Sequence, residues 1–270
     1  MDEIVNELKE KSIKFKSINV AFTDEGKGKV VVFLHGFLGA KEVWNPFSKE
    51  LSKTQRIITI DLLGHGNTSC LSYVHTMEEM AEAVESVISH LKIRKYFLVG
   101  HSLGGYVSLA MAENNPDNLK GLVMFHSSAK ADDKQRKIDR DRVARIVKIN
   151  SELFINEAIP NLFNTSFKPY KRGVEKIKKI ALNTSKQGVV AALEGMKVRL
   201  DREIVLKFAP YPVLFIIGKE DNVLPYKDLI FQSDMPENGS CILLDNVGHM
   251  GFVESEIETC QTIKKFVMDN

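Results

Sequence analysis

Cysteine is scarce in this chain of 270 residues, and long apolar runs are absent. The three cysteines, Cys70, Cys241 and Cys260, are odd in number and far apart. Such spacing does not suit a disulfide framework, so we expect free thiols in a reducing compartment, by default the cytoplasm. No apolar stretch approaches the roughly 18 residues that a membrane helix needs. The start from Met1 to Leu8 is acidic and amphipathic, unlike a signal peptide, so we expect no insertion into a membrane.

An excess of charge of one sign is also lacking. Lysine and arginine number 37 and aspartate and glutamate 35, which leaves a net charge of +2. A chain so close to neutrality gives no reason to expect a nucleic-acid partner. The distribution is uneven, however, because residues 129–208 hold 19 basic and 10 acidic side chains, a local charge of +9. This basic segment fits either a lining that attracts anionic substrates or, more commonly, a solvated outer face.

Short runs rich in β-branched residues recur along the chain and alternate with helical patterns. The buried strands that we expect are Val30 to Leu34, Arg56 to Ile60, Tyr96 to Val99, Leu122 to Phe125, Val213 to Ile217 and Cys241 to Leu244. This alternation predicts an α/β fold with a mostly parallel central sheet flanked by helices. The looser alternation from Ser12 to Thr23 predicts an antiparallel hairpin at the N-terminal edge.

Two segments show the apolar spacing of one helix face. The first follows Thr76, which forms a capping-box pattern with Glu79. The second lies near the C-terminus. Their expected sheet-facing residues are Met77, Met80, Ala81, Val84, Val87, Ile88 and Leu91 in the first, and Ile257, Cys260, Ile263 and Val267 in the second. Both helices should pack on the sheet.

The alternation of strands and helices stops between residues 129 and 208. This interval contains helical, charge-rich sequence such as Asp132 to Lys148 and Val174 to Leu182, with no convincing strand. We therefore predict two parts: a core of residues 1–128 and 209–270, and an all-helical insertion of residues 129–208.

A nucleophile pattern lies between a strand and a helix. Gly100-His101-Ser102-Leu103-Gly104 fits G-x-S-x-G and sits directly after the strand Tyr96 to Val99 and before the helical stretch Tyr106 to Ala112. A sharp turn of this kind exposes the serine hydroxyl in a strained backbone conformation, and it needs glycines because side chains there would clash. Ser102 is the predicted nucleophile.

A serine hydroxyl is a weak nucleophile and needs a nearby base, which in turn needs an orienting carboxylate. Asp221 follows the strand Val213 to Ile217, and His249 follows the strand Cys241 to Leu244. Serine, aspartate and histidine occur in the chain order expected for this architecture, each past the end of a different strand. Glu220 and Asp245 are neighbouring carboxylates that could take the place of Asp221.

A glycine-containing loop follows the strand Val30 to Leu34. Its sequence is His35-Gly36-Phe37-Leu38-Gly39, and a loop at this place is where an oxyanion hole is built. The backbone N–H groups of Phe37 and Leu103 are the expected donors to a substrate oxygen that becomes negatively charged.

Together these motifs resemble the α/β-hydrolase superfamily over nearly the whole chain. The matching segments are His35-Gly36-Phe37, Asp61-Leu62-Leu63-Gly64-His65-Gly66-Asn67-Thr68-Ser69, Gly100-His101-Ser102-Leu103-Gly104-Gly105, Gly218 to Asp221 and Gly248-His249. The resemblance implies an α/β-hydrolase fold with a helical cap inserted after the sixth strand, where residues 129–208 fall. It also implies that Ser102 is nucleophile, Asp221 acid and His249 base, with Phe37 and Leu103 as oxyanion donors. Leu63 departs from the proline that many members have, which affects a turn rather than the chemistry.

Three further side chains are candidates for substrate contact: His126, Trp44 and His101. His126 follows a predicted strand, where a structural role is equally plausible, and Trp44 is ambiguous between core and pocket wall. Five histidines cluster after predicted strands, namely His35, His65, His101, His126 and His249. Their spacings do not match a metal-binding motif, so we expect no metal and no other cofactor.

The main functional hypothesis is hydrolysis of a small carboxylic ester by a serine esterase-like enzyme. The alternatives are a lyase with the same three residues, resembling the menaquinone-pathway synthase, and a slow-turnover receptor that senses a small ligand. Because serine rather than aspartate occupies the nucleophile position, epoxide-hydrolase and dehalogenase chemistry are not expected. The expected partner is a small-molecule ester, and the expected assembly is a monomer or homodimer.

Overall fold

The computed structural model describes residues 10–167 and 170–270 of the chain. Eight strands form one sheet in the spatial order β1-β2-β4-β3-β5-β6-β7-β8. Their bounds are β1 (Lys11–Phe15), β2 (Ile18–Gly26), β3 (Val30–Leu34), β4 (Arg56–Ile60), β5 (Tyr96–His101), β6 (Leu119–Phe125), β7 (Val213–Gly218) and β8 (Gly239–Leu244). All six predicted strands are present, and four of them, β5 to β8, begin two or three residues earlier or end one or two residues later than predicted. The prediction that Cys241 to Leu244 is buried was wrong, because β8 is an edge strand and only Leu244 of this run is buried.

The sheet is parallel except at its N-terminal edge. β1 pairs antiparallel with β2, and β2 pairs antiparallel with β4, whereas every pair from β4 to β8 is parallel. The predicted hairpin is confirmed, and its second strand runs to Gly26 because β2 continues along β4. The carboxyl ends of β3, β5, β6, β7 and β8 therefore meet at one edge of the sheet.

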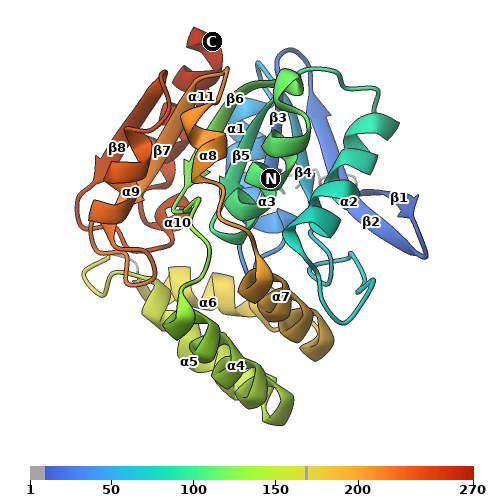
Figure 1. Ribbon diagram of the computed structural model, residues 1–270, viewed down its shortest axis with the longest axis vertical. Coiled ribbons are helices and arrows are strands. Elements are labelled where there is room, and N and C mark those ends of the chain that lie inside the picture. The colour runs from blue at the N-terminus through green and yellow to red at the C-terminus, as the bar shows by residue number, and fades with distance from the viewer. Residues whose placement is uncertain (1–9, 168–169) are drawn as a thin grey trace, which may run out of the picture.

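Helices cover the sheet on both sides (Figure 1). The core helices are α1 (Asn45–Leu51), α2 (Met77–His90), α3 (Leu103–Asn114), α8 (Glu203–Lys207), α9 (Tyr226–Ser233), α10 (Gly251–Glu254) and α11 (Glu256–Asp269), with short 3₁₀ turns η1 (Lys41–Trp44) and η2 (Pro116–Asn118). Buried apolar residues from the strands and these helices form one continuous core. The alternation read from the sequence thus corresponds to the α/β-hydrolase fold.

The segment between β6 and β7 contains no strand within its described residues. It holds α4 (Lys134–Ile149), α5 (Ser151–Ala158), the 3₁₀ turn η3 (Pro160–Leu162), α6 (Tyr170–Ala181) and α7 (Lys186–Val198). We call α4 to α7 with their connections the cap. Figure 1 shows the cap gathered below the end of the sheet at which β6 stops. The chain then returns through α8, which contacts α3 of the core.

Local sequence explains where several helices begin. Asp133 accepts a hydrogen bond from the Arg136 N–H at 2.8 Å, so α4 begins two residues later than predicted. Thr76 likewise accepts from the N–H of Glu79 at 3.1 Å. The Glu79 carboxylate does not complete the expected capping box, because it accepts from the Ser72 hydroxyl at 3.1 Å instead.

The cysteines, the helix lengths and the buried face of α11 were also predicted from the sequence. All three cysteines are free thiols. No described helix is both long enough and apolar enough to cross a membrane. Cys260, Ile263 and Val267 of α11 are buried as predicted, but Ile257 is 73% exposed. The prediction for Ile257 was wrong because it lies in the first turn of α11, where the helix face has turned toward a surface groove beside Pro46 and Glu50.

Candidate active site

Ser102 stands at the tight turn between β5 and α3. Its φ of 50° and ψ of −114° are strained for a residue with a side chain. The turn is held by hydrogen bonds from the Ser102 N–H to the Phe125 carbonyl at 3.0 Å and from the Ser127 hydroxyl to the Ser102 carbonyl at 2.7 Å. Gly104 allows the close approach, since a Cβ there would lie 2.4 Å from the Leu34 carbonyl oxygen. The serine hydroxyl is thereby presented at the carboxyl edge of the sheet.

His249 and Asp221 complete a hydrogen-bonded chain from Ser102. The Ser102 Oγ lies 3.0 Å from Nε2 of His249, and Nδ1 of His249 lies 2.7 Å from Oδ2 of Asp221. The other Asp221 oxygen, Oδ1, accepts from the N–H groups of Val223 at 2.8 Å and Leu224 at 3.0 Å. These contacts orient the carboxylate, and they place a base within reach of the serine proton.

The environment of Asp221 keeps it ionised. Burial alone would raise its pKa, but the neighbouring His249 and His126 outweigh burial and hold the pKa well below its usual value. The alternative carboxylates do not reach His249. Glu220 is exposed, and Asp245 is 69% exposed and pairs with Lys219. Asp221 is therefore the carboxylate that the fold brings to the histidine.

Two backbone N–H groups near Ser102 have no hydrogen-bond acceptor within the described residues. They belong to Phe37, in the loop after β3, and Leu103, the first residue of α3. The loop of Phe37 lies against the turn, because a Cβ on Gly36 would be 3.3 Å from Cβ of Ser102. Unpaired N–H groups at a helix start favour negative charge nearby.

His35 and His65 hold loops through hydrogen bonds. His35 places Nδ1 2.8 Å from the Gly36 carbonyl, and its Nε2 accepts from the Leu62 N–H at 3.0 Å, so the ring links the Phe37 loop to the loop after β4. Burial lowers the pKa of His35 to about 4, which keeps the ring neutral and preserves this pair of bonds at neutral pH. His65 lies 3.0 Å from the Leu63 carbonyl.

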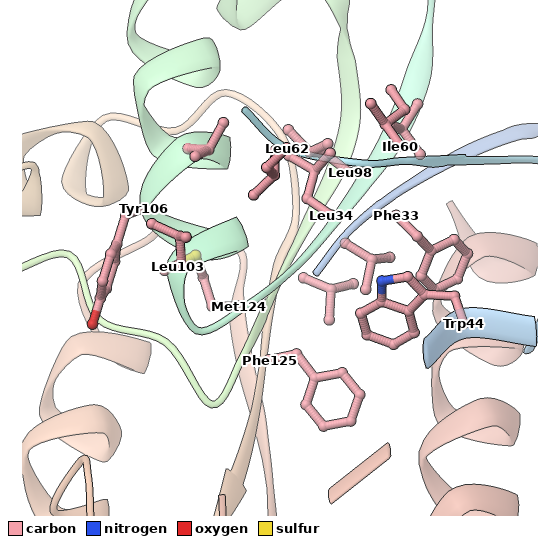
Figure 2. Close-up of a cluster of buried hydrophobic side chains, with 14 of the residues drawn as sticks. Phe33, Leu34, Trp44, Ile60, Leu62, Leu98, Leu103, Tyr106, Met124 and Phe125 are labelled. Carbon is pink, nitrogen blue, oxygen red and sulfur yellow. The ribbon is translucent and has the colours of Figure 1, made fainter. Parts of the chain in front are cut away.

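Trp44 was predicted as a candidate for substrate contact, and its position contradicts that role. The side chain is fully buried. Figure 2 shows its ring among apolar side chains, beside Phe33 and Phe125, and the ring centroids lie 5.0 Å and 6.0 Å from that of Trp44. Trp44 belongs to the core because the 3₁₀ turn η1 directs it inward beneath the sheet edge.

His101 and His126 are also buried, which corrects their proposed contact with substrate. His101 places Nε2 2.9 Å from the His249 carbonyl oxygen. His126 places Nδ1 3.3 Å from Oδ2 of Asp221 and 3.3 Å from the backbone N of Gly218. The contacts of both rings are with His249, Asp221 and Gly218, so these two side chains support the candidate site from within the protein.

Within the described residues, one cluster brings together three side chains of kinds that can bind a metal ion. They are His126, Asp221 and His249, and their ligand atoms lie within 4.8 Å of one another. Two ligand atoms of a tetrahedral zinc ion are separated by about 3.3 Å, given metal–ligand bonds of about 2.0 to 2.1 Å. The His249–Asp221 separation of 2.7 Å is a hydrogen bond instead. The geometry of this group therefore fits proton transfer better than metal binding.

Two neighbours of His249, Leu162 and Glu254, were not predicted from the sequence. The His249 N–H donates to the carbonyl of Leu162 in the cap at 2.8 Å. Glu254 accepts from the N–H groups of Gly248 and Met250 on either side of His249, at 3.1 Å and 3.0 Å. Backbone contacts between distant segments leave no side-chain pattern in a sequence. The only available signal was that Glu254 lies five residues after His249.

Two named proteins are similar to this chain in sequence. An Arabidopsis thaliana protein, PHYLLO, chloroplastic, is 26% identical over 273 positions, which cover 90% of this chain but only 16% of that protein. A putative 2-succinyl-6-hydroxy-2,4-cyclohexadiene-1-carboxylate synthase of Bacillus subtilis is 29% identical over 221 positions, 76% of this chain and 78% of that protein. This chain thus spans most of the second relative and a small part of the first.

A thermophilic esterase from Thermogutta terrifontis, solved with malate bound, has a similar structure. The TM-score is 0.91 at 30% sequence identity, over 97% of this chain and 98% of that one. The family model described as the alpha/beta hydrolase fold matches residues 29–256, which run from the strand before the Phe37 loop to just beyond His249. The chain belongs to the α/β-hydrolase family.

Proposed function

We propose that this protein is a serine hydrolase that cleaves a small carboxylic ester through an acyl-enzyme on Ser102. The observation that carries the proposal is the chain of two hydrogen bonds from Ser102 to His249 and from His249 to Asp221, at 3.0 Å and 2.7 Å. The strained backbone of Ser102 supports it, because strain of this kind persists where the surrounding structure holds a reactive group in place.

In the first half of the reaction, Ser102 becomes acylated. His249 accepts the hydroxyl proton on Nε2 while Oγ attacks the ester carbonyl carbon, and Asp221 stabilises the imidazolium through Nδ1–H. The carbonyl oxygen becomes negative and would accept hydrogen bonds from the free N–H groups of Phe37 and Leu103. Each donor would stabilise the transition state by roughly 3 to 4 kcal/mol. His249 then returns the proton to the departing alcohol, and the carbon–oxygen bond to that alcohol breaks.

In the second half, water replaces the alcohol. His249 removes a proton from water as the water oxygen attacks the acyl carbon, and the same two N–H groups hold the new oxyanion. Transfer of that proton to Oγ releases the carboxylic acid and restores Ser102. This sequence of steps uses only groups of the chain and one water molecule.

Three arginines at the base of the cap already have partners. Arg140 and Arg199 both pair with Asp132, and Arg202 pairs with Glu78 and Glu113. These buried or half-buried guanidinium groups already have carboxylate partners among the described residues, so they are not available to a carboxylate of a substrate. The esterase with the similar structure also supports ester cleavage.

A lyase that uses the same three residues is the second candidate, and the similarity to the Bacillus subtilis putative synthase favours it. The lyase predicts negligible turnover of esters by a protein with an intact site. A ligand-sensing receptor would instead turn over slower than about one ester per minute, far below the usual enzyme median of about 10 per second.

The test is turnover of p-nitrophenyl acetate and butyrate by the wild type, Ser102→Ala and Ser89→Ala. Ser89 is exposed on α2, so its replacement controls for serine loss in general. We expect Ser102→Ala to lower kcat by at least about a thousandfold and Ser89→Ala to leave it unchanged. Retention of a tenth of the activity by Ser102→Ala overturns the role of Ser102, and an inactive wild type overturns ester hydrolysis.

A further inference from the structure

The loop that carries His249 is fastened to the cap by four hydrogen bonds. The His249 N–H donates to the Leu162 carbonyl at 2.8 Å, and the side-chain amide of Asn164 donates to the Asn246 carbonyl at 2.8 Å. The remaining two meet on Glu254 Oε2, which accepts from the N–H of Asn164 at 2.9 Å and of Gly248 at 3.1 Å. One carboxylate oxygen thus joins a cap segment to the loop.

Glu254 is the last residue of α10, between the sheet and the cap (Figure 1). Its second oxygen, Oε1, accepts from the N–H of Met250 at 3.0 Å. The carboxylate therefore receives three backbone N–H groups, two from residues flanking His249 and one from the cap. The pKa of Glu254 lies above its usual value, because burial and the nearby charge of Asp221 raise it more than these N–H groups lower it. The three bonds therefore offset part of the cost of a buried charge.

The contact is close enough to depend on glycine. A Cβ on Gly248 would lie 2.7 Å from the backbone N of Asn164 and 2.9 Å from the Leu162 carbonyl oxygen. Any other residue at 248 would push the cap segment away from the loop. The peptide before His249 and residues 162–164 of the cap therefore pack backbone against backbone.

The other side of the His249 peptide is held by the core. Its carbonyl oxygen lies 2.9 Å from Nε2 of His101, the residue before Ser102. Burial, together with the nearby His249 and His126, lowers the pKa of His101 well below its usual value, so the neutral ring donates one Nε2–H to this carbonyl. The histidine backbone is thus fixed between the turn of Ser102 and the cap.

We propose that Glu254 is a positioning residue that ties cap residues 162–164 to the His249 loop, so that the cap itself holds the base of the proposed triad beside Ser102. This inference rests on the proposed function for the role of His249. It makes the segment around Leu162 a fixed part of the site, because movement of that segment would withdraw the acceptor of the His249 N–H. A shift of about 1 Å in a reacting group costs about a hundredfold in rate.

The test compares Glu254→Gln with two other variants. Glutamine has one carbonyl oxygen, so it cannot accept all three N–H groups without facing one with its own NH₂. Asn164→Asp removes the donor to the Asn246 carbonyl and leaves Glu254 intact. Glu256→Gln is the matched control, because Glu256 is exposed on α11, two residues away.

Three measurements are made on each full-length variant: kcat and KM for p-nitrophenyl butyrate, the rate at which a fluorophosphonate labels Ser102, and hydrogen exchange by mass spectrometry. Labelling of the serine needs the base but no natural substrate. We expect Glu254→Gln and Asn164→Asp to lower kcat and the labelling rate together, by about 10- to 100-fold, with KM within twofold. Their effects should combine less than additively in the double variant, because both act on one contact.

Hydrogen exchange should become faster in peptides covering 160–166 and 246–252 and stay unchanged in peptides covering β5 and α3. Faster exchange in 246–252 alone would show that Glu254 stabilises α10 without tying it to the cap, and unchanged labelling despite faster exchange in both would show that the tie does not position His249. Either result overturns the proposal. Failure of ester hydrolysis is recognised separately, by a wild type that is labelled on Ser102 but turns over no ester.

Discussion

The ring centroid of Trp44 lies 5.4 Å from that of Phe252. Phe252 is the second residue of α10 and follows His249 by three residues. Phe252 in turn lies edge-on to His101 at 4.8 Å. The only tryptophan of the chain therefore packs against Phe252, which in turn contacts the ring of His101 beside the proposed base. Its indole Nε1 is buried without a hydrogen-bond partner among the described residues, so its contribution is packing.

We expect Trp44→Ala to lower the free energy of unfolding by about 3 to 5 kcal/mol, as removal of a buried aromatic ring does. Trp44→Phe should cost less than half as much, because it keeps a ring and forfeits no hydrogen bond. Urea unfolding followed by far-ultraviolet circular dichroism measures both. KM for p-nitrophenyl butyrate should stay within twofold in Trp44→Phe, whereas a rise of fivefold or more at unchanged stability would restore the substrate contact that burial argues against.

His126 is the second imidazole beside Asp221, and its Nδ1 faces two partners at once, the Gly218 N–H and Asp221 Oδ2. Burial lowers the pKa of His126 despite the opposing effect of Asp221, so the ring is neutral at pH 7 and serves one partner at a time. Phenylalanine cannot form a hydrogen bond with either partner. We expect His126→Phe to cost about 1 to 3 kcal/mol of stability, the usual effect of leaving a buried polar group unpaired.

Asparagine is the informative comparison at position 126. Its short amide reaches where Nδ1 stands, and it tolerates the positive φ of 44° found there. His126→Asn should therefore recover most of the lost stability, measured by thermal unfolding, while KM for p-nitrophenyl butyrate stays within twofold of wild type in both variants. A selective increase of KM in both variants, with stability intact, would show instead that His126 contacts the substrate.

The positions of Ser102, Asp221 and His249 could be predicted from sequence because each lies in the loop or turn that follows a strand. Parallel strands end at one edge, so residues far apart in the chain are brought together by a pattern of short local runs. The helical character of residues 129–208 was likewise local information. The way the cap docks is not, because it depends on backbone atoms of Leu162 and Gly248 that carry no side-chain signature.

Burial was the harder property to infer. Trp44, His101 and His126 all follow strands or loops of the reactive edge, and position along the chain does not say whether a ring faces the opening or the layer beneath it. The basic character of the cap was equally ambiguous. Its buried arginines proved to be paired with Asp132, Glu78 and Glu113, which only the folded arrangement of α4, the α7–α8 connection and the core could reveal.

Asp132 joins the start of the cap to its end. Its buried carboxylate pairs with Arg140 of α4 and Arg199 after α7, and the Arg199 guanidinium lies 4.1 Å from the ring centroid of Tyr106 in α3. Burial would raise the pKa of Asp132, but hydrogen bonds and charge from Arg140 and Arg199 prevail and lower it below its ordinary value of 3.8. Removal of one member of a buried ion pair costs about 3 to 5 kcal/mol.

Because the folded protein lowers this pKa, the stabilisation by Asp132 is fully present above the unfolded pKa near 3.8 and is lost as the pH falls through the lower folded pKa. Asp132→Asn should therefore be about 3 kcal/mol less stable than wild type at pH 7, and the gap should narrow below about pH 4. Urea unfolding followed by Trp44 fluorescence at pH 7, 5 and 3 measures the gap. Asp133→Asn is the control, since asparagine caps α4 as well as aspartate does, and its stability should match wild type at pH 7. A gap for Asp132→Asn that stays constant from pH 7 to pH 3 would contradict an ionised Asp132 as the link between α4 and the α7–α8 connection.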